Sequence, residues 1–269
     1  MKHVEPHGNA TRQRYTMVAI CCGVALAIVV AAMIVCVRTT RIADVSSTSQ
    51  MVPRNATSYG AFHLVGDGRV APPSTPVSAH AVRMDEFVDL HCPFCARVEN
   101  AIGPRVASLM RAGKLDLYVY PLSFLDSMSD DDYSLRAANA FVTVAEKDPR
   151  HAFAFLTALY RPDFQPREGH DYHTTSDADV ARQAEHVGVP ASVSALFSRH
   201  MYMSWVETTT QKQMQRDDVF PGGRFSVPTV VMGAQCHGSR LTNFIPMEAP
   251  VPNTMSSFQS AYTAASHRH

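Results

Sequence analysis

The stretch Glu86-Phe-Val-Asp-Leu-His-Cys92-Pro-Phe-Cys95 decides how this 269-residue chain is interpreted. Its first half is an apolar run of the kind that forms a buried strand. After it, apolar residues recur at spacings of four and three, which is the period of a helix. These residues are Val98, Ile102, Val106 and Leu109, with Glu99 and Arg105 among the polar positions. The two cysteines therefore stand where a strand ends and a helix begins.

This position has consequences for the chemistry of Cys92. A helix N-terminus carries partial positive charge and unpaired N–H groups, which stabilise an anion such as a thiolate. Pro93 suits the first helical position, because its missing N–H costs nothing there. Cys95 lies one turn further along and can close a disulfide with Cys92. A thiolate of low pKa beside a second thiol favours thiol–disulfide exchange.

Three other interpretations of the cysteine pair remain open. It could be half of a zinc site, although no second Cys-x-x-Cys or His-x-x-x-His follows. It could be a structural disulfide, although so short a ring constrains little chain entropy. It could also be accidental. His170 and His173 are spaced like metal ligands, but no further ligand accompanies them, so we predict loop histidines and no metal site.

The segment resembles the active-site strand and helix of the thioredoxin superfamily, and more closely the DsbA-like thiol–disulfide oxidoreductases. The family's acidic residue, six positions before the first cysteine, corresponds to Glu86. A second mark is Phe225-Ser-Val-Pro228-Thr-Val-Val-Met-Gly233, which is similar to the family's cis-proline strand. The resemblance covers roughly residues 80–265. Val227 stands where the family usually has Thr, and Phe94 where its best-known member has His, which bears on the redox potential.

The resemblance implies an α/β, thioredoxin-like fold with a helical insertion at about residues 129–219. It also implies roles. Cys92 would exchange disulfides with a substrate and Cys95 would resolve them. Glu86, buried near Cys95, would move protons to it, the alternative being a hydrogen-bonded buried carboxylate without such a role. The residues expected to bind substrate are Pro93, Phe94, Val227 and Pro228, with Pro228 in a cis bond against the disulfide and the Val227 backbone pairing with an extended peptide.

Residues 15–37 are almost unbroken apolar sequence, following a short polar tail at residues 1–14. About 20 such residues cross a bilayer as a helix, so one N-terminal transmembrane helix is predicted. A cleaved signal peptide is the rival, but its apolar core is typically about 7–15 residues long. Lipid modification of Cys36 is a further alternative. Since disulfide catalysis suits an oxidising compartment, we expect a single-pass protein of the cell membrane whose C-terminal domain is extracytoplasmic.

Residues 38–78 are rich in Ser and Pro and predict a linker, within which residues 59–65 could form a short strand. The folded domain is then expected over residues 79–269. Its predicted elements are a strand at 114–120 broken by Pro121, helices at 135–160 (in two pieces), 180–187 and 190–214, a strand at 224–232, a hairpin at 233–238 leading to a last strand near Arg240, and a helix from Asn253.

Three functional hypotheses follow. The first is formation of disulfides in exported proteins that contain cysteines, with reoxidation by a membrane redox partner and no cofactor beyond the Cys92–Cys95 disulfide. The second is a reductase or isomerase of the same fold, and the third a non-catalytic binding module. The chain has 24 basic and 24 acidic residues, so no nucleic-acid partner is predicted. Cys236, without an evident partner, is expected to be buried.

Overall fold

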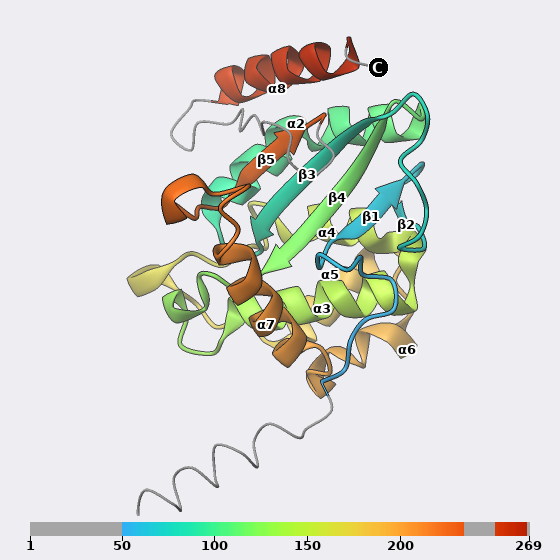
Figure 1. The fold of residues 1–269 in the computed structure, drawn as a ribbon. Coiled ribbons are helices and arrows are strands. Elements are labelled where there is room, and N and C mark those ends of the chain that lie inside the picture. The colour runs from blue at the N-terminus through green and yellow to red at the C-terminus, as the bar shows by residue number, and fades with distance from the viewer. Residues whose placement is uncertain (1–49, 234–250, 268–269) are drawn as a thin grey trace, which may run out of the picture. The chain divides into compact units, whose positions relative to one another are not determined.

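The computed structural model describes residues 50–233 and 251–267. These residues contain a five-stranded mixed sheet with the strand order β2-β1-β4-β3-β5 (Figure 1). The strands are β1 (Phe62–Val65), β2 (Arg69–Val70), β3 (Val82–Asp89), β4 (Leu115–Leu122) and β5 (Thr229–Met232). The β3–β4 pair is parallel and the other pairs are antiparallel. The predicted α/β fold is therefore confirmed.

Helix α2 (Pro93–Arg111) connects β3 to β4, as the change of period after Cys92 predicts. Its apolar residues are buried, and so is Glu99, which the sequence pattern placed among the polar positions. Pro121 does not break the following strand but lies inside β4, opposite Val88 of β3. The prediction of a break was wrong because β1 pairs with β4 only as far as Val119, so no strand on that side needs an N–H from Pro121.

The helices between β4 and β5 form the predicted insertion. They are α3 (Tyr133–Lys147), α4 (Ala152–Leu159), α5 (Asp177–His186), α6 (Ala191–Ser194) and α7 (Met203–Met214). The single helix predicted from residue 190 to 214 is wrong. His200 adopts a left-handed conformation with φ of 51°, and a 3-10 turn separates α6 from α7. The last described helix is α8 (Val251–Ser266).

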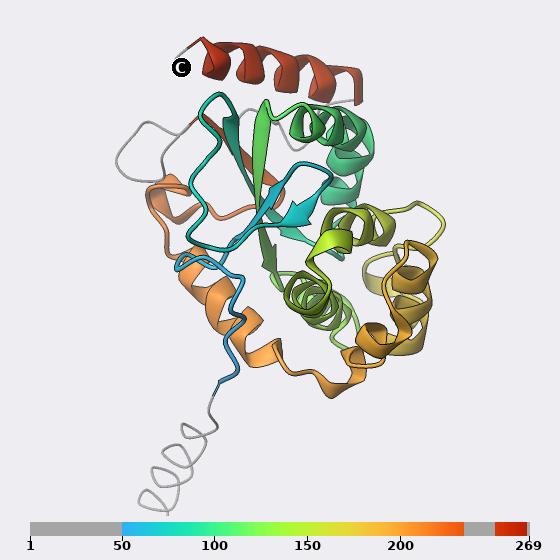
Figure 2. The same ribbon diagram turned by 90° about the vertical axis from the view of Figure 1, so that its right-hand side faces the viewer.

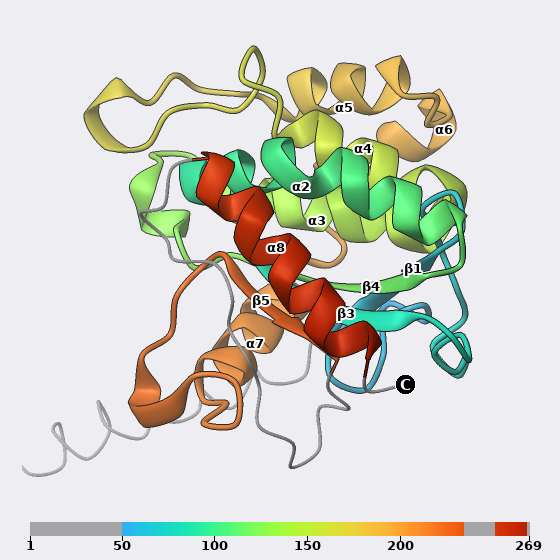
Figure 3. The same ribbon diagram turned by 90° about the horizontal axis from the view of Figure 1, so that it is seen from above.

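The insertion lies mostly on one side of the sheet. Figure 2 shows α2 and helices α3 to α6 together on that side, and α8 packs against α2, β3 and β5 (Figure 3). Helix α7 and the turn that follows it reach both faces. Its Trp205 ring lies 6.0 Å from Phe62, and the guanidinium of Arg216, just beyond its end, lies 5.8 Å from the ring of Phe87. Phe62 and Phe87 are on opposite faces, because they align with the successive β4 residues Val119 and Tyr120.

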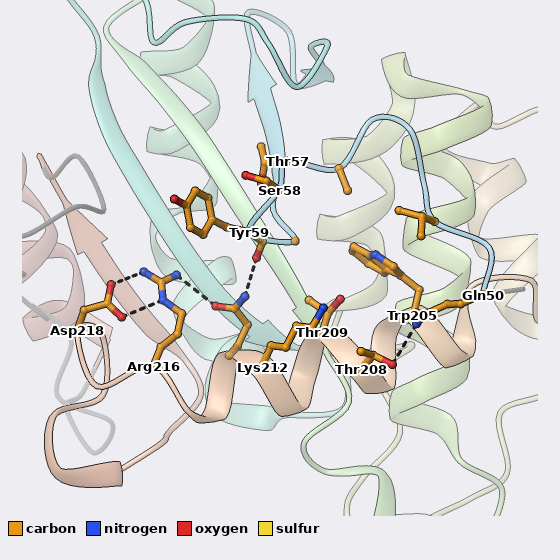
Figure 4. A pocket seen from close by; sticks show the side chains of 14 residues that line it. Gln50, Thr57, Ser58, Tyr59, Trp205, Thr208, Thr209, Lys212, Arg216 and Asp218 are labelled. Atoms are coloured by element: carbon orange, nitrogen blue, oxygen red, sulfur yellow. Dashed lines mark hydrogen bonds and ion pairs between the residues drawn. The ribbon is translucent and has the colours of Figure 1, made fainter. Parts of the chain in front are cut away.

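The folded unit begins at Gln50, well before the domain start predicted at residue 79. Residues 50–60 run along α7, where Gln213 donates to the carbonyl of Tyr59 at 2.6 Å and Gln50 donates to Thr208 at 3.0 Å. A pocket of about 600 Å³ lies between this segment and α7 (Figure 4). The described part of the predicted linker is thus built into the fold through hydrogen bonds, although its composition is typical of flexible chain.

Several predictions concern parts of the chain outside the described residues. These are the transmembrane helix at residues 15–37, the hairpin and last strand predicted at residues 233–240 (of which only Gly233 is described), and the burial of Cys236. Among the helices that the structure does describe, none is long and apolar enough to cross a membrane. The same residues contain no group of three or more His, Cys, Asp or Glu side chains arranged to hold a metal ion.

Gly60 tests whether residues 50–60 belong to the fold. It has φ of +85°, and a Cβ added to it would lie 2.4 Å from the Cγ2 atom of Thr209 on α7. Gly60→Ala should lower the free energy of unfolding by about 3 kcal/mol, through backbone strain and overpacking together. Gly66→Ala is the matched control, since Gly66 has φ of +60° but open space around it, and should cost about 1 kcal/mol. Equal losses in urea unfolding would contradict the packing of this segment on α7.

Candidate active site

Cys92 is the residue that caps the N-terminus of α2, with Pro93 at the first helical position. Its own N–H donates to the carbonyl of Asp89 at 3.1 Å, which makes the tight turn out of β3. Its carbonyl accepts the first intrahelical bond, from Ala96 N–H at 3.1 Å, and a second bond from the Gln165 side chain at 3.2 Å. The predicted junction of strand and helix is therefore confirmed.

The two thiols are free in this structure and both are buried. A hydrogen bond from the Cys95 thiol lowers the pKa of Cys92, and backbone N–H groups of Cys95 and Phe94 lower it further. Burial raises the pKa of Cys95 well above its usual value, and the neighbouring Cys92 adds a further, smaller increase. The pair is therefore asymmetric: Cys92 ionises first, and Cys95 holds its proton and donates it toward Cys92.

The loop before β5 lies directly against this pair. The Val227–Pro228 peptide bond is cis, which confirms the prediction from the resemblance. The Cys92 thiol donates to the carbonyl of Val227 at 3.7 Å. Pro93 is exposed and Phe94 is half-buried, with the Arg97 guanidinium 4.3 Å from the centre of its ring. The structure thus places the residues predicted to bind substrate around one thiol, two of them from a segment 135 residues away.

Two buried carboxyl groups lie on the strand and the helix that meet at the pair. Burial raises the pKa of Glu86, on β3, to about 7. Glu99 lies on α2, one turn after Cys95, and its pKa is raised well above the usual value by burial and then by the charge of Glu86. The Oε1 atom of Glu99 has no hydrogen-bond partner, and its side chain lines a cleft between α2 and α4 of about 280 Å³. The predicted burial of Glu86 is therefore confirmed, and its raised pKa lies near neutrality.

Sequence reasoning missed three buried or bridging residues around the site. Asp89 is completely buried and accepts hydrogen bonds from neighbouring backbone and from Ser134. Gln165, in the long loop after α4, bonds the carbonyls of Leu90 and Cys92. Glu99 had a signal in the sequence, because it follows Cys95 by four residues and so lies on the same helix face. Gln165 had none, since only folding brings it to the turn.

Comparison with known proteins agrees with the fold that carries this site. The sequence model of the family described as thioredoxin matches residues 78–243. The reduced crystal structure of DsbA from Mycobacterium tuberculosis is similar with a TM-score of 0.56 at 22% identity, over 75% of this chain and 99% of that one. MdbA, a thiol-disulfide oxidoreductase from Actinomyces oris, gives 0.56 at 19% identity, over 81% of this chain and 94% of that one. At these identities the likeness shows a shared fold.

A curated relative matches a shorter region. Over 118 residues, which is 43% of this chain, the sequence is 32% identical to the serine/threonine-protein kinase PknE of Mycobacterium tuberculosis. The match covers 21% of that kinase, so this chain corresponds to about a fifth of the length of its curated relative.

The raised pKa of Glu86 predicts how stability depends on pH. Below pH 4.5 both the folded and the unfolded chain carry the proton. Between pH 4.5 and about 7 only the unfolded chain releases it, so the free energy of unfolding falls as the pH rises. Glu86→Gln removes this loss. The free energy of unfolding of Glu86→Gln minus that of wild type should therefore be about 3 kcal/mol larger at pH 8 than at pH 4.

Urea unfolding of both proteins at the two pH values measures this difference. Glu207→Gln, an exposed position on α7, is the control and should show no such gain. A Glu86→Gln effect of the same size at pH 4 and pH 8 would refute the raised pKa.

Proposed function

The chain belongs to the thioredoxin family, and on that premise we propose that it is a protein thiol–disulfide oxidoreductase acting through Cys92 and Cys95. The observation that carries this proposal is the asymmetry of the two thiols next to the Val227 carbonyl. One sulfur has a lowered pKa and faces the cis-proline loop, and the other is buried with a raised pKa. This is the arrangement that a nucleophilic or leaving thiol and a resolving thiol require.

In the oxidising direction, a substrate thiolate attacks Cys92 of the Cys92–Cys95 disulfide. The bond between the two enzyme sulfurs breaks, and Cys95 leaves and takes a proton, for which Glu86 is the donor. A second substrate thiolate then attacks the mixed disulfide, and Cys92 leaves as a thiolate. The substrate loses two electrons and gains a disulfide, while the pair becomes reduced. The lowered pKa of Cys92 favours this second step, because a more acidic thiol leaves faster.

The substrate surface in this proposal is partly apolar. Phe225, three residues before Pro228, packs edge-on against Phe124 from the loop after β4, at 4.8 Å between ring centres. The side chain of Phe124 is 39% exposed. An unfolded polypeptide with apolar residues near its cysteines would pair with the Val227 backbone and cover these rings. The redox centre is the cysteine pair itself, so the proposal includes no further cofactor.

A reductase or isomerase of the same fold is the second candidate, and two observations favour it. The side chain of Phe94 adds no hydrogen-bond donor for the Cys92 thiolate, and the charge of Asp89 raises the pKa of Cys92. Both features make the disulfide less oxidising than the helix N-terminus alone would. The equilibrium potential against glutathione distinguishes the two. A value near −120 mV indicates a strong oxidant and one near −270 mV a reductant.

We further propose that the domain works outside the cytoplasm on exported proteins, anchored by residues 15–37, and exchanges electrons with a membrane redox partner. The apolar length of that segment supports the anchor. The proposed disulfide chemistry supports a location outside the cytoplasm, because protein disulfides persist in oxidising environments.

Two cysteine variants test the exchange reaction. Cys92→Ser should lower the oxidation rate of a reduced, unfolded substrate protein at least 1,000-fold, roughly to the uncatalysed rate, since no attack can begin. Cys95→Ala should instead accumulate mixed disulfides between Cys92 and the substrate, because no resolving thiol remains. Non-reducing electrophoresis and mass spectrometry of the linked peptides report both outcomes. Mixed disulfides through Cys95 in the Cys92→Ser protein, with none in the Cys95→Ala protein, would reverse the assigned roles.

A further inference from the structure

We propose that Asp89 is a positioning residue of the redox pair: a buried anion, held beside the turn, that opposes the Cys92 thiolate and makes the couple less oxidising. The inference rests on the proposed function. Asp89 is the last residue of β3 and stands three positions before Cys92. It takes no part in the bond-breaking and proton-transfer steps described above, yet it is the most extensively hydrogen-bonded carboxylate at the site.

The Asp89 carboxylate ties three elements together. One oxygen accepts the backbone N–H of His91 at 2.9 Å, and the other accepts that of Leu125, in the loop after β4, at 2.8 Å. The Ser134 hydroxyl, in the first turn of α3, lies 2.8 and 2.7 Å from the two oxygens. The carboxylate is completely buried, so its place relative to these elements is fixed.

The main chain of Asp89 fixes the same carboxylate relative to the sulfur of Cys92. Its carbonyl accepts the N–H of Cys92 at 3.1 Å, and also the hydroxyl of Tyr160, at the end of α4, at 3.1 Å. A charge on Asp89 therefore acts on Cys92 at constant geometry. The turn that presents the thiol at the helix N-terminus also brings a negative charge beside it.

All the hydrogen-bond donors to this carboxylate in the described residues are neutral, and it forms no ion pair with any of those residues. The titratable groups around it come from each element that packs on it: His91, Cys92 and Cys95 from the turn and α2, Asp126 from the loop after β4, Tyr133 from α3, Tyr160 from the end of α4, and Glu168 from the following loop. His91 Nε2 is 3.2 Å from the Arg167 carbonyl, and its Nδ1 is buried without a partner.

Electrostatics supports the geometry. Burial raises the pKa of Asp89 to about 6, against the lowering effect of its hydrogen bonds, so the group is ionised at neutral pH. Its charge raises the pKa of both Cys92 and Cys95. Because such coupling is reciprocal, a thiolate on Cys92 raises the pKa of Asp89 in turn. Reduction of the disulfide by two electrons then binds one proton at Cys95 and, near pH 6, a further fraction of a proton at Asp89.

The test uses the full-length chain equilibrated with glutathione buffers between pH 4.5 and 8. Acid quenching and mass spectrometry then give the oxidised fraction of the Cys92–Cys95 peptide. Asp89→Asn keeps the size of the side chain and removes its charge. At pH 7.5 we expect its equilibrium constant with glutathione to shift about tenfold toward the oxidising end, which corresponds to about 30 mV. Below pH 5 the shift should largely vanish, because wild-type Asp89 is then protonated.

The pH dependence of Cys92 alkylation provides a second readout. The Cys92 pKa should be lower in Asp89→Asn than in wild type. A residue that only held the loops together would change the free energy of unfolding and leave both the potential and this pKa unchanged. The redox potential plotted against pH should change slope at the pKa of Asp89. Ser134→Ala retains the Asp89 charge but removes a hydrogen bond that lowers this pKa, so the change of slope should move to higher pH. This variant keeps the test decisive if Asp89→Asn fails to fold.

The outcomes separate this inference from the proposed function. A measurable couple with the same potential in wild type and Asp89→Asn, or an unmoved change of slope in Ser134→Ala, would overturn the role of Asp89 alone. A wild-type chain with no measurable Cys92–Cys95 couple would overturn the proposed function and this inference with it.

Discussion

The site depends on one constraint, which is that Cys92 caps the N-terminus of α2 at the point where β3 ends. Its sulfur is therefore placed next to unpaired backbone N–H groups and within reach of the Cys95 thiol, and both lower its pKa. The parallel pairing of β3 with β4 sets the direction of the helix between them. The antiparallel pairing of β3 with β5 then brings the Val227 carbonyl to the same sulfur. The sheet register thus determines the reactive geometry.

Three carboxyl groups are buried in the elements that carry this pair, at a cost to stability. Glu86, Glu99 and Asp89 are all buried, and burial raises the pKa of each. Glu86 and Glu99 can therefore hold protons that exposed carboxylates would have lost at neutral pH, whereas Asp89, with a pKa of about 6, is ionised there. Thiol–disulfide exchange releases and consumes protons, and raised pKa values near neutrality are suited to it. Backbone N–H groups at the helix N-terminus lower the pKa of Cys92 and the charge of Asp89 raises it, so the two act on this thiol in opposite directions.

The segment before β3 completes the sheet. β1 pairs with β4, and without it β4 would present an open edge beside the active-site strand. Residues 50–60 then pass along α7, where Gly60 allows the backbone to approach Thr209. The same helix carries Thr210, whose hydroxyl accepts the N–H of Ser123 at the end of β4. The N-terminal segment and the insertion therefore support the same strand from two sides.

Local patterns in the sequence determined the β3–α2–β4 unit, most helices of the insertion, and the reactive residues Cys92 and Cys95, since period and capping act over a few neighbouring residues. The cis state of Val227–Pro228 and the role of Glu86 were expected only through resemblance. The tertiary structure alone decided that residues 50–78 fold with the domain, that Pro121 remains within a strand, and that Glu99 is buried. It also joined Asp89, Ser134 and Gln165 to the redox turn. These features depend on contacts between residues far apart in the chain, and a desolvated carboxylate has the same local sequence signal as an exposed one.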